Sequence, residues 1–343
     1  MKKTAWFGLS FALAVAAAAC QNEDAPENGA ANGEADPEEN GDASQEEAVD
    51  LDGDEFYVHN DELQMTHIHG LGYAGNDGLL YVATHHGLAI YDDGSWYETA
   101  EEKNDYMGFN AVESGFYTSG HPGEASSFDV DPIGLVKSTD GGKTLESLDL
   151  LGETDFHVKG TGYYSNAVYV YNPAPSDRLE ETGLYYTLDD AESWEKAEGD
   201  GLPEANYDQG GYPDYSVAVH PVEESTLAVG TAEGLFLSED YGNTFEQTTV
   251  DLPVMSAVFH EEQVYAAVWD GEVRLVQLDG EEVTELNMPE IDEQDGIQYI
   301  AVNPEYREEI AVTTFMGDGF LSEDSGAEWK QIIEGGGVHG DEH

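Results

Sequence analysis

The feature that most constrains the fold of this chain is a unit that occurs twice. Residues 217–240 contain the segments Val-Ala-Val-His-Pro, Leu-Ala-Val-Gly-Thr and Gly-Leu-Phe-Leu-Ser-Glu-Asp, in that order. Residues 300–324 repeat them as Ile-Ala-Val-Asn-Pro, Ile-Ala-Val-Thr-Thr and Gly-Phe-Leu-Ser-Glu-Asp. Such self-similarity indicates a repeat architecture. The short apolar alternations, broken by Gly, Asp and Asn, predict strands, so we expect an all-β chain.

Four octets of one pattern close successive units. They are residues 138–145, 187–194, 238–245 and 322–329, with Asp140, Asp189, Asp240 and Asp324 at the third position. The carboxylate is expected to accept hydrogen bonds across a turn, and Gly to supply a positive φ. Weaker relatives at 91–96 and 277–282 bring the count to about six units of about 46 residues each, which predicts a β-propeller of four-stranded blades. Six blades are favoured, and seven follow if residues 174–184 hide an extra strand.

The two ends of the chain differ from the repeats. Residues 1–20 combine Lys2 and Lys3 with an apolar stretch, which is typical of a secretory signal. Cys20, the only cysteine, follows three alanines and resembles the lipidation site of bacterial lipoproteins. Residues 21–50 are expected to be an acidic disordered tether, residues 51–333 the propeller and residues 334–343 a flexible tail. We expect residues 54–59 to add the outermost strand of the last blade.

The charge of the chain excludes some partners. Its 73 Asp and Glu face only 11 Lys and Arg, a formal net charge of −62. Nucleic acid is not expected to bind, because its phosphates need a basic patch. The hydrophobic fraction of 40% nevertheless provides a core. Such an acidic surface repels itself in dilute buffer, so we expect a monomer from a salt-loving organism.

Histidines gather where a propeller places its ligands. In each blade the first strand lines the central channel, and its start shares one face with the turn between the second and third strands. This rule places six histidines from three adjacent blades at one mouth: His67, His69, His85, His86, His121 and His157. Two histidines one residue apart on a strand point the same way, and a third from a neighbouring hairpin makes a first shell for zinc or a similar divalent cation. Asp105, Asp155 and one of Asp129 and Asp131 can complete or orient that shell. Histidines that only bond the blade backbone are the open alternative.

A glycosidase needs two carboxylates about 5 to 10 Å apart. Sequence alone selects no pair of carboxylates. The candidates at the mouth are Asp105, Asp155, Asp214, Asp270 and Glu272, with Tyr212 or Tyr215 as a phenolic nucleophile. The four octet aspartates are interpreted as structural.

The octets, together with residues 67–72 and 83–88, resemble the Asp-box (BNR) repeats of a group of secreted bacterial lipoproteins in the sialidase superfamily, described as glycosylhydrolase-like. The resemblance covers residues 56 to 333. It implies an extracytoplasmic propeller, anchored by a lipid to the cell membrane or surface. Sialidases bind their substrate carboxylate with three Arg, the first of them in an Arg-Ile-Pro-type motif at the start of the propeller. The first Arg of this chain is Arg178, in the third expected blade, and no such motif occurs, so sialidase activity is not expected.

Three functions remain open. The first is a glycoside hydrolase or lyase that acts on a neutral or cationic sugar polymer, as the resemblance implies. The second is a non-catalytic propeller that binds a carbohydrate or protein, or acts as an assembly factor. The third is a propeller that binds or senses a divalent metal through the histidine mouth.

Overall fold

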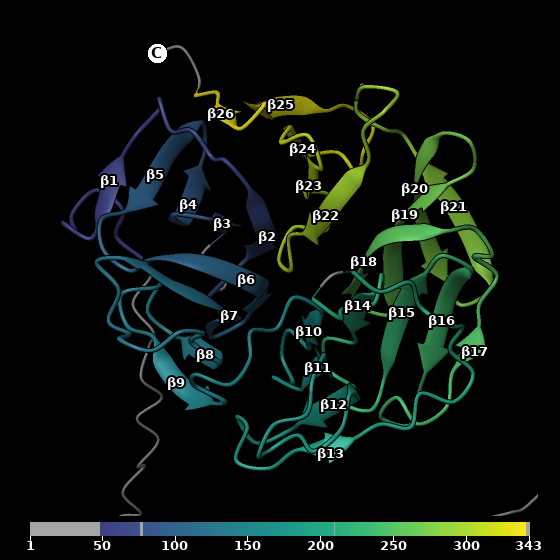
Figure 1. Cartoon of the computed structure of the whole chain (residues 1–343). Helices are drawn as coiled ribbons and strands as arrows, with labels where there is room; N and C mark the ends of the chain where they lie inside the picture. The colour runs from purple at the N-terminus through teal and green to yellow at the C-terminus, as the bar shows by residue number, and fades with distance from the viewer. Residues whose placement is uncertain (1–48, 76–77, 209, 341–343) are drawn as a thin grey trace, which may run out of the picture. The chain divides into compact units, whose positions relative to one another are not determined.

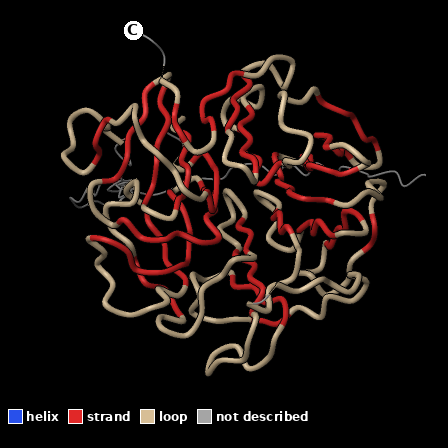
Figure 2. The backbone as a smooth tube through the Cα atoms, turned by 45° about the horizontal axis from the view of Figure 1, so that its top comes forward, coloured by secondary structure: helices blue, strands red, loops and turns tan. Residues whose placement is uncertain are grey.

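The computed structural model describes residues 49–75, 78–208 and 210–340. The signal segment, Cys20 and the tether up to residue 48 lie outside the described residues. Within those ranges the regular elements are β-strands joined by turns and loops, as Figure 2 shows.

The strands form six antiparallel sheets, which we call blades 1 to 6. From its inner to its outer edge, blade 1 consists of β2 (Ile68–Tyr73), β3 (Leu80–Thr84), β4 (Gly87–Asp92), β5 (Ser95–Thr99) and β1 (Tyr57–His59). Blade 2 consists of β6 (Lys103–Val112), β7 (Gly115–Glu124), β8 (Leu135–Ser138) and β9 (Glu146–Asp149). Blade 3 consists of β10 (Lys159–Thr161), β11 (Val168–Asn172), β12 (Gly183–Thr187) and β13 (Glu195–Lys196).

The second half of the domain follows the same order. Blade 4 consists of β14 (Ser216–Val219), β15 (Leu227–Thr231), β16 (Gly234–Ser238) and β17 (Glu246–Gln247). Blade 5 consists of β18 (Val254–His260), β19 (Gln263–Trp269), β20 (Val273–Asp279) and β21 (Glu282–Leu286). Blade 6 consists of β22 (Ile297–Val302), β23 (Ile310–Thr314), β24 (Gly319–Ser322), β25 (Lys330–Glu334) and β26 (Gly337–Val338).

The blades close into a ring around the inner strands. Each of β2, β6, β10, β14, β18 and β22 contacts the inner strand of the next blade, and β22 contacts β2 (Figure 1). The expected all-β propeller is confirmed, with six blades. The seven-bladed alternative is wrong, because the stretch between β11 and β12 carries no strand.

The core lies between the blades. Six hydrophobic clusters each join the facing surfaces of two neighbouring blades. The second strands β3, β11, β15 and β23 are therefore buried along their whole length. This burial on both faces explains their unbroken apolar sequences, such as Leu-Ala-Val-Gly-Thr in β15.

The four octets share one hydrogen-bond pattern at the turn between the third and fourth strands of their blades. In blade 4, Asp240 accepts from the backbone N–H of Thr244 at 2.8 Å and from its hydroxyl at 2.7 Å, and Ser238 Oγ accepts from the N–H of Gly242. These bonds lower the pKa of Asp240. Asp140, Asp189 and Asp324 accept the corresponding backbone bonds. In the second octet Ala191 adopts a φ of 66°, although it carries a Cβ where the other octets have Gly.

The ring closes differently from the expectation for residues 54–59. Strand β1 is the outermost strand of blade 1, where Tyr57 pairs with Thr99, and is not part of blade 6. Tyr57 is buried in the cluster between blades 1 and 2 and donates its hydroxyl to the Gly141 carbonyl, which holds β1 on that side. Blade 6 is instead completed by the next strand of its own hairpin, β26.

The expectation of a flexible tail from residue 334 is wrong for residues 334–340. Val338 donates its N–H to the Leu63 carbonyl, and Gly336 accepts from the N–H of Met65, so this segment joins blade 6 to the residues before blade 1. The His339 carbonyl also accepts from the indole N–H of the fully buried Trp96. A sequence rich in Gly lacks apolar periodicity, and the segment is ordered by its pairing with β25 together with these long-range bonds. Residues 341–343 lie outside the described part.

Candidate functional site

Histidines and aspartates from blades 1 to 3 lie at one end of the inner strands. They stand at or just before the start of inner strands, near the end of a second strand, or in the segment that follows a second strand: His67, His69, His85, His86, Asp105, His121, Asp131, Asp155 and His157. His121, expected in a turn, lies within β7. Because the first three strands of each blade are antiparallel, these positions lie at the same end of the blades, on one face of the propeller. We call this face the histidine mouth.

Three imidazoles converge in blade 1. His67, His69 and His85 each offer a nitrogen, and these three atoms lie within 4.8 Å of one another. The ring centroids are 6.0 Å apart for His67 and His69, 5.8 Å for His67 and His85 and 6.3 Å for His69 and His85. We call these three residues the first cluster. Three imidazole nitrogens this close together are candidate ligands for one cation.

Asp105 of the neighbouring blade faces the first cluster. One carboxylate oxygen lies 2.8 Å from Nδ1 of His85, and the other, Oδ1, lies 3.5 Å from Nε2 of His69. Both Oδ1 and His69 Nε2 are buried without a hydrogen-bond partner. Buried polar atoms are rarely left unpaired, because each costs about 1–3 kcal/mol. These two atoms are therefore the best-placed atoms at the mouth to bind a ligand.

A local irregularity aims His69 at the channel. The pairing of β2 with β3 shifts register between Ile68 and Gly70, and His69 is the extra residue. The same shift occurs at Met255 at the start of β18 and at Gln298 at the start of β22. All three side chains line the central channel. A bulge re-aims a side chain, so a repeated bulge sets which residues enter the mouth.

Burial lowers the pKa of His69, and the charges of His67 and His85 lower it further against the opposing effect of Asp105. A lowered pKa keeps the imidazole neutral near neutral pH. The neutral ring is the form that binds a metal.

A second group of side chains surrounds Asp155. His157 Nε2 lies 2.5 Å and His121 Nε2 lies 3.3 Å from the same oxygen, Oδ2 of Asp155. The other nitrogen of His121 lies 2.6 Å from Asp131. We call His121, Asp155 and His157 the second cluster.

Pairing of β6 with β7 places the two clusters side by side. Asp105, which faces the first cluster, is the direct partner of His121, which belongs to the second. Directly paired residues on antiparallel strands have their Cβ atoms about 4.5–5.5 Å apart. Five of the six histidines expected at one mouth therefore form two adjacent groups. The sixth, His86, packs with its ring centroid 4.8 Å from that of His85.

Two other sequence candidates have separate partners. Asp270, in the turn before β20, lies 3.4 Å from the guanidinium of Arg274. Tyr215 donates its hydroxyl to the Pro203 carbonyl at 2.8 Å, and burial, with nearby Tyr207 and Asp214, raises its pKa to about 12. A phenol with a raised pKa stays protonated at neutral pH and is a poor nucleophile.

Two further side chains shape the site. Tyr212, the alternative phenolic nucleophile predicted from the sequence, stacks on His157 with the ring centroids 4.4 Å apart and an angle of 7° between the planes. Lys159 is buried, donates to Asn110 Oδ1 at 2.7 Å, and has its pKa lowered by desolvation. A lysine in a Val-Lys-Gly segment carries no local pattern that marks its role.

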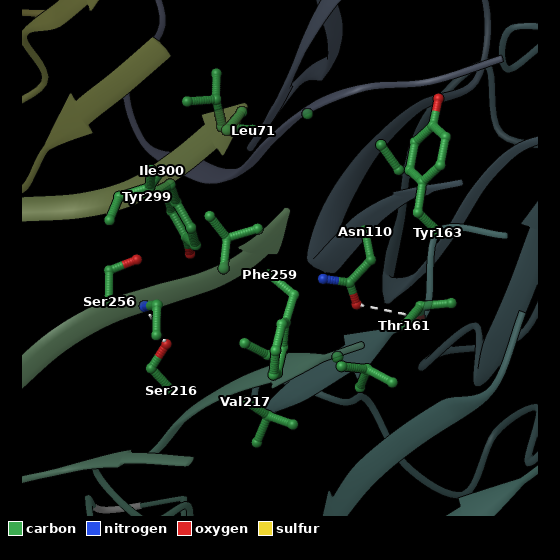
Figure 3. A pocket seen from close by; sticks show the side chains of 18 of the residues that line it. Leu71, Asn110, Thr161, Tyr163, Ser216, Val217, Ser256, Phe259, Tyr299 and Ile300 are labelled. Atoms are coloured by element: carbon green, nitrogen blue, oxygen red, sulfur yellow. Dashed lines mark hydrogen bonds between the residues drawn. The ribbon is translucent and has the colours of Figure 1, made fainter. Parts of the chain in front are cut away.

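The mouth opens into a central channel of about 730 Å³, which all six inner strands line. Figure 3 shows side chains from several blades around this space, among them Leu71, Asn110, Val217, Phe259 and Ile300. His69 and His157, one from each cluster, line the same channel. Both clusters therefore border the same cavity.

Comparisons with known proteins show the fold. No family model and no curated protein matches the chain. A GH74 enzyme of Niastella koreensis is similar over 82% of this chain and 47% of its own length, with a TM-score of 0.52 and 17% identity. The GH74 xyloglucanase of Xanthomonas campestris is similar over 80% and 46%, with a TM-score of 0.51 and 16% identity. The chain spans about half the length of these two enzymes.

A gluconolactonase from Xanthomonas campestris is also similar, over 78% of this chain and 89% of its own, with a TM-score of 0.53 and 12% identity. These neighbours are glycosidase and lactonase propellers. At sequence identities this low, the similarity shows a common fold and nothing further. Over the described ranges, the chain contains no helical segment with the length and apolarity needed to span a membrane.

Proposed function

We propose that this chain is a metal-binding propeller, in which His67, His69, His85 and Asp105 hold one divalent cation such as zinc at the channel mouth. The observation that carries the proposal is the approach of three imidazole nitrogens to within 4.8 Å of one another. Beside them, His69 Nε2 and Asp105 Oδ1 are buried and lie 3.5 Å apart without a hydrogen bond. Zinc bonds of about 2.0–2.2 Å at tetrahedral angles separate neighbouring ligand atoms by about 3.4 Å. A cation between these two atoms would satisfy both.

The donor set favours binding over hydrolysis at this position. Three imidazoles and one carboxylate fill a tetrahedral shell, whereas catalytic zinc sites keep one position for water. Imidazole nitrogens favour zinc, copper or nickel over magnesium or calcium. The first cluster is thus suited to a tightly held cation that is stored, sensed or used to order the mouth.

Metal analysis tests this assignment. Purified protein is loaded with zinc sulfate, dialysed and analysed for zinc per chain, beside the double variant His67→Ala/His69→Ala. We expect the variant to lose one equivalent. A matched control replaces two exposed histidines that also pair with carboxylates, His59 and His339, and retains the wild-type content. An unchanged content in the first variant would refute the site.

A glycoside hydrolase is the second candidate. The observation in its favour is that two carboxylates, Asp105 and Asp155, stand at one mouth of a fold shared with GH74 enzymes. No arginine lines the channel over the described residues, which argues against a sialidase. Release of reducing sugar from neutral polysaccharides by metal-free protein, abolished by Asp105→Asn and by Asp155→Asn, would favour this candidate over the first.

We further propose that the propeller works outside the cytoplasm, anchored to the membrane through a lipid on Cys20. The support is the sequence of residues 1–20 and the long acidic segment that follows. Outside the cell the mouth would meet environmental metal ions directly.

A further inference from the structure

We propose that the second cluster, His121, Asp155 and His157, binds a second divalent cation next to the first cluster. Two imidazole Nε2 atoms lie 2.5 and 3.3 Å from one carboxylate oxygen, Asp155 Oδ2. Two histidines and one carboxylate are a recurrent donor set for zinc and for iron. This proposal does not depend on the first site, because the two clusters share no donor.

The surroundings of the second cluster resemble those of metal ligands. A ligating histidine usually donates its other ring N–H to a carboxylate, and a ligating carboxylate is itself hydrogen-bonded. His121 directs its other nitrogen to Asp131 at 2.6 Å. The hydroxyl of Tyr212 donates to the Asp155 backbone carbonyl and lies 3.3 Å from Oδ1, which leaves Oδ2 for the histidines. Stacking on Tyr212 also fixes the plane of the His157 ring.

The charge balance also calls for a cation. Among the described residues, Asp105, Asp131 and Asp155 form ion pairs with histidines only, and no lysine or arginine approaches them. Most other paired acids of the domain, such as Glu98, Asp149 and Asp190, have a lysine or arginine partner. Three carboxylates from two neighbouring blades are therefore left to neutral or partly protonated imidazoles. Two divalent cations would neutralise them.

The two sites are expected to differ in zinc affinity and in the number of coordination positions that the protein leaves free. The first cluster already has three nitrogens within 4.8 Å of one another. The donors of the second cluster bond to one another and must turn toward a common cation, so the second cation is expected to bind more weakly. Its three protein donors leave coordination positions free. Because His157 lines the channel, those positions can receive an oxygen atom of a channel ligand.

Equilibrium dialysis of the full chain against zinc, after stripping with EDTA, tests the second site. We expect two zinc ions per wild-type chain at saturation. Asp155→Asn/His157→Asn should bind one, with the tighter dissociation constant unchanged, and His67→Ala/His69→Ala should also bind one, with the weaker constant. Two zinc ions on Asp155→Asn/His157→Asn, or a single zinc on the wild type that this variant retains, overturns the second site. A single zinc on the wild type that Asp155→Asn/His157→Asn loses would overturn the first site instead, so the two proposals fail separately.

A variant that leaves His121, Asp155 and His157 in place guards against misfolding. Asp131 is exposed, so Asp131→Asn is expected to fold normally. Loss of an outer partner of a ligating histidine usually weakens metal binding by about 10- to 100-fold. We expect that weakening for the second zinc only, read from dialysis and from the visible spectrum of the cobalt-loaded protein. The same zinc affinity and cobalt spectrum in Asp131→Asn and the wild type would contradict the proposal.

Discussion

The replacement His69→Leu separates a metal ligand from an ordinary structural histidine. Leucine has a similar volume but donates no lone pair. Both proteins compared carry Asp155→Asn, so that zinc at the second cluster does not contribute. The reference is Asp155→Asn alone, and the test protein adds His69→Leu.

The expected change in stability with zinc follows from the linkage between metal binding and folding. At a zinc concentration 100 times the dissociation constant of the first site, binding stabilises the folded state by about 2.7 kcal/mol. For a domain of this size, each kcal/mol corresponds to about 2 °C in melting temperature, so zinc should raise the melting temperature of the reference by about 5 °C. The variant should show no such rise.

The expected difference in stability between the two metal-free proteins follows from the burial of His69. His69 Nε2 has no hydrogen bond to lose, and the side chain is only 17% exposed. Leucine therefore fills a similar volume with apolar atoms and removes a nitrogen that made no hydrogen bond. We expect the two metal-free proteins to agree within about 1 kcal/mol.

Differential scanning calorimetry in EDTA and in excess zinc, at fixed salt and pH, measures both quantities. Two results would refute the reasoning. One is an equal zinc-induced rise in the variant. The other is a metal-free loss well above 2 kcal/mol, which would mean that His69 is a structural residue of the blade.

Three further predictions concern pH, salt and anchoring. Burial lowers the pKa of His121, but the hydrogen bond to Asp131 and the charge of Asp155 outweigh burial, so the pKa is raised in the folded protein. Protonated His121 therefore stabilises the folded state. This stabilisation is complete below about pH 6.5, the pKa in the unfolded chain, and is lost as the pH rises through the folded pKa. In urea melts with EDTA, His121→Gln should therefore cost most below pH 6.5 and least in alkali, and a cost independent of pH would contradict this. The net charge of −62 predicts a melting temperature that rises from 0.01 M to molar salt as the screening length falls from about 30 to about 3 Å, and a flat response would count against a salt-adapted surface. Finally, Cys20→Ser should move the protein from the membrane to the soluble fraction, and retention on the membrane would exclude a lipid on Cys20.

The sequence alone determined the architecture and the face that carries the site. The repeated segments at 217–240 and 300–324 are local patterns, and each blade is a local hairpin array, so pattern and structure agree closely. The octets likewise contain within eight residues nearly all the hydrogen-bond partners of their turns. The order of strands in a blade was enough to place His67, His85, His121 and His157 at one end of the channel.

Only the tertiary structure decided which of those residues meet. The division into two clusters, the approach of Asp105 to His69 and His85, and the stacking of Tyr212 on His157 join residues of different blades. The extra residue that turns His69 into the channel is a register shift between two strands, which a single strand does not reveal. The ring closure by Leu63 and Val338 joins nearly opposite ends of the chain. Local patterns fix a blade because its partners are neighbours in sequence, whereas the site depends on how separate blades pack against one another.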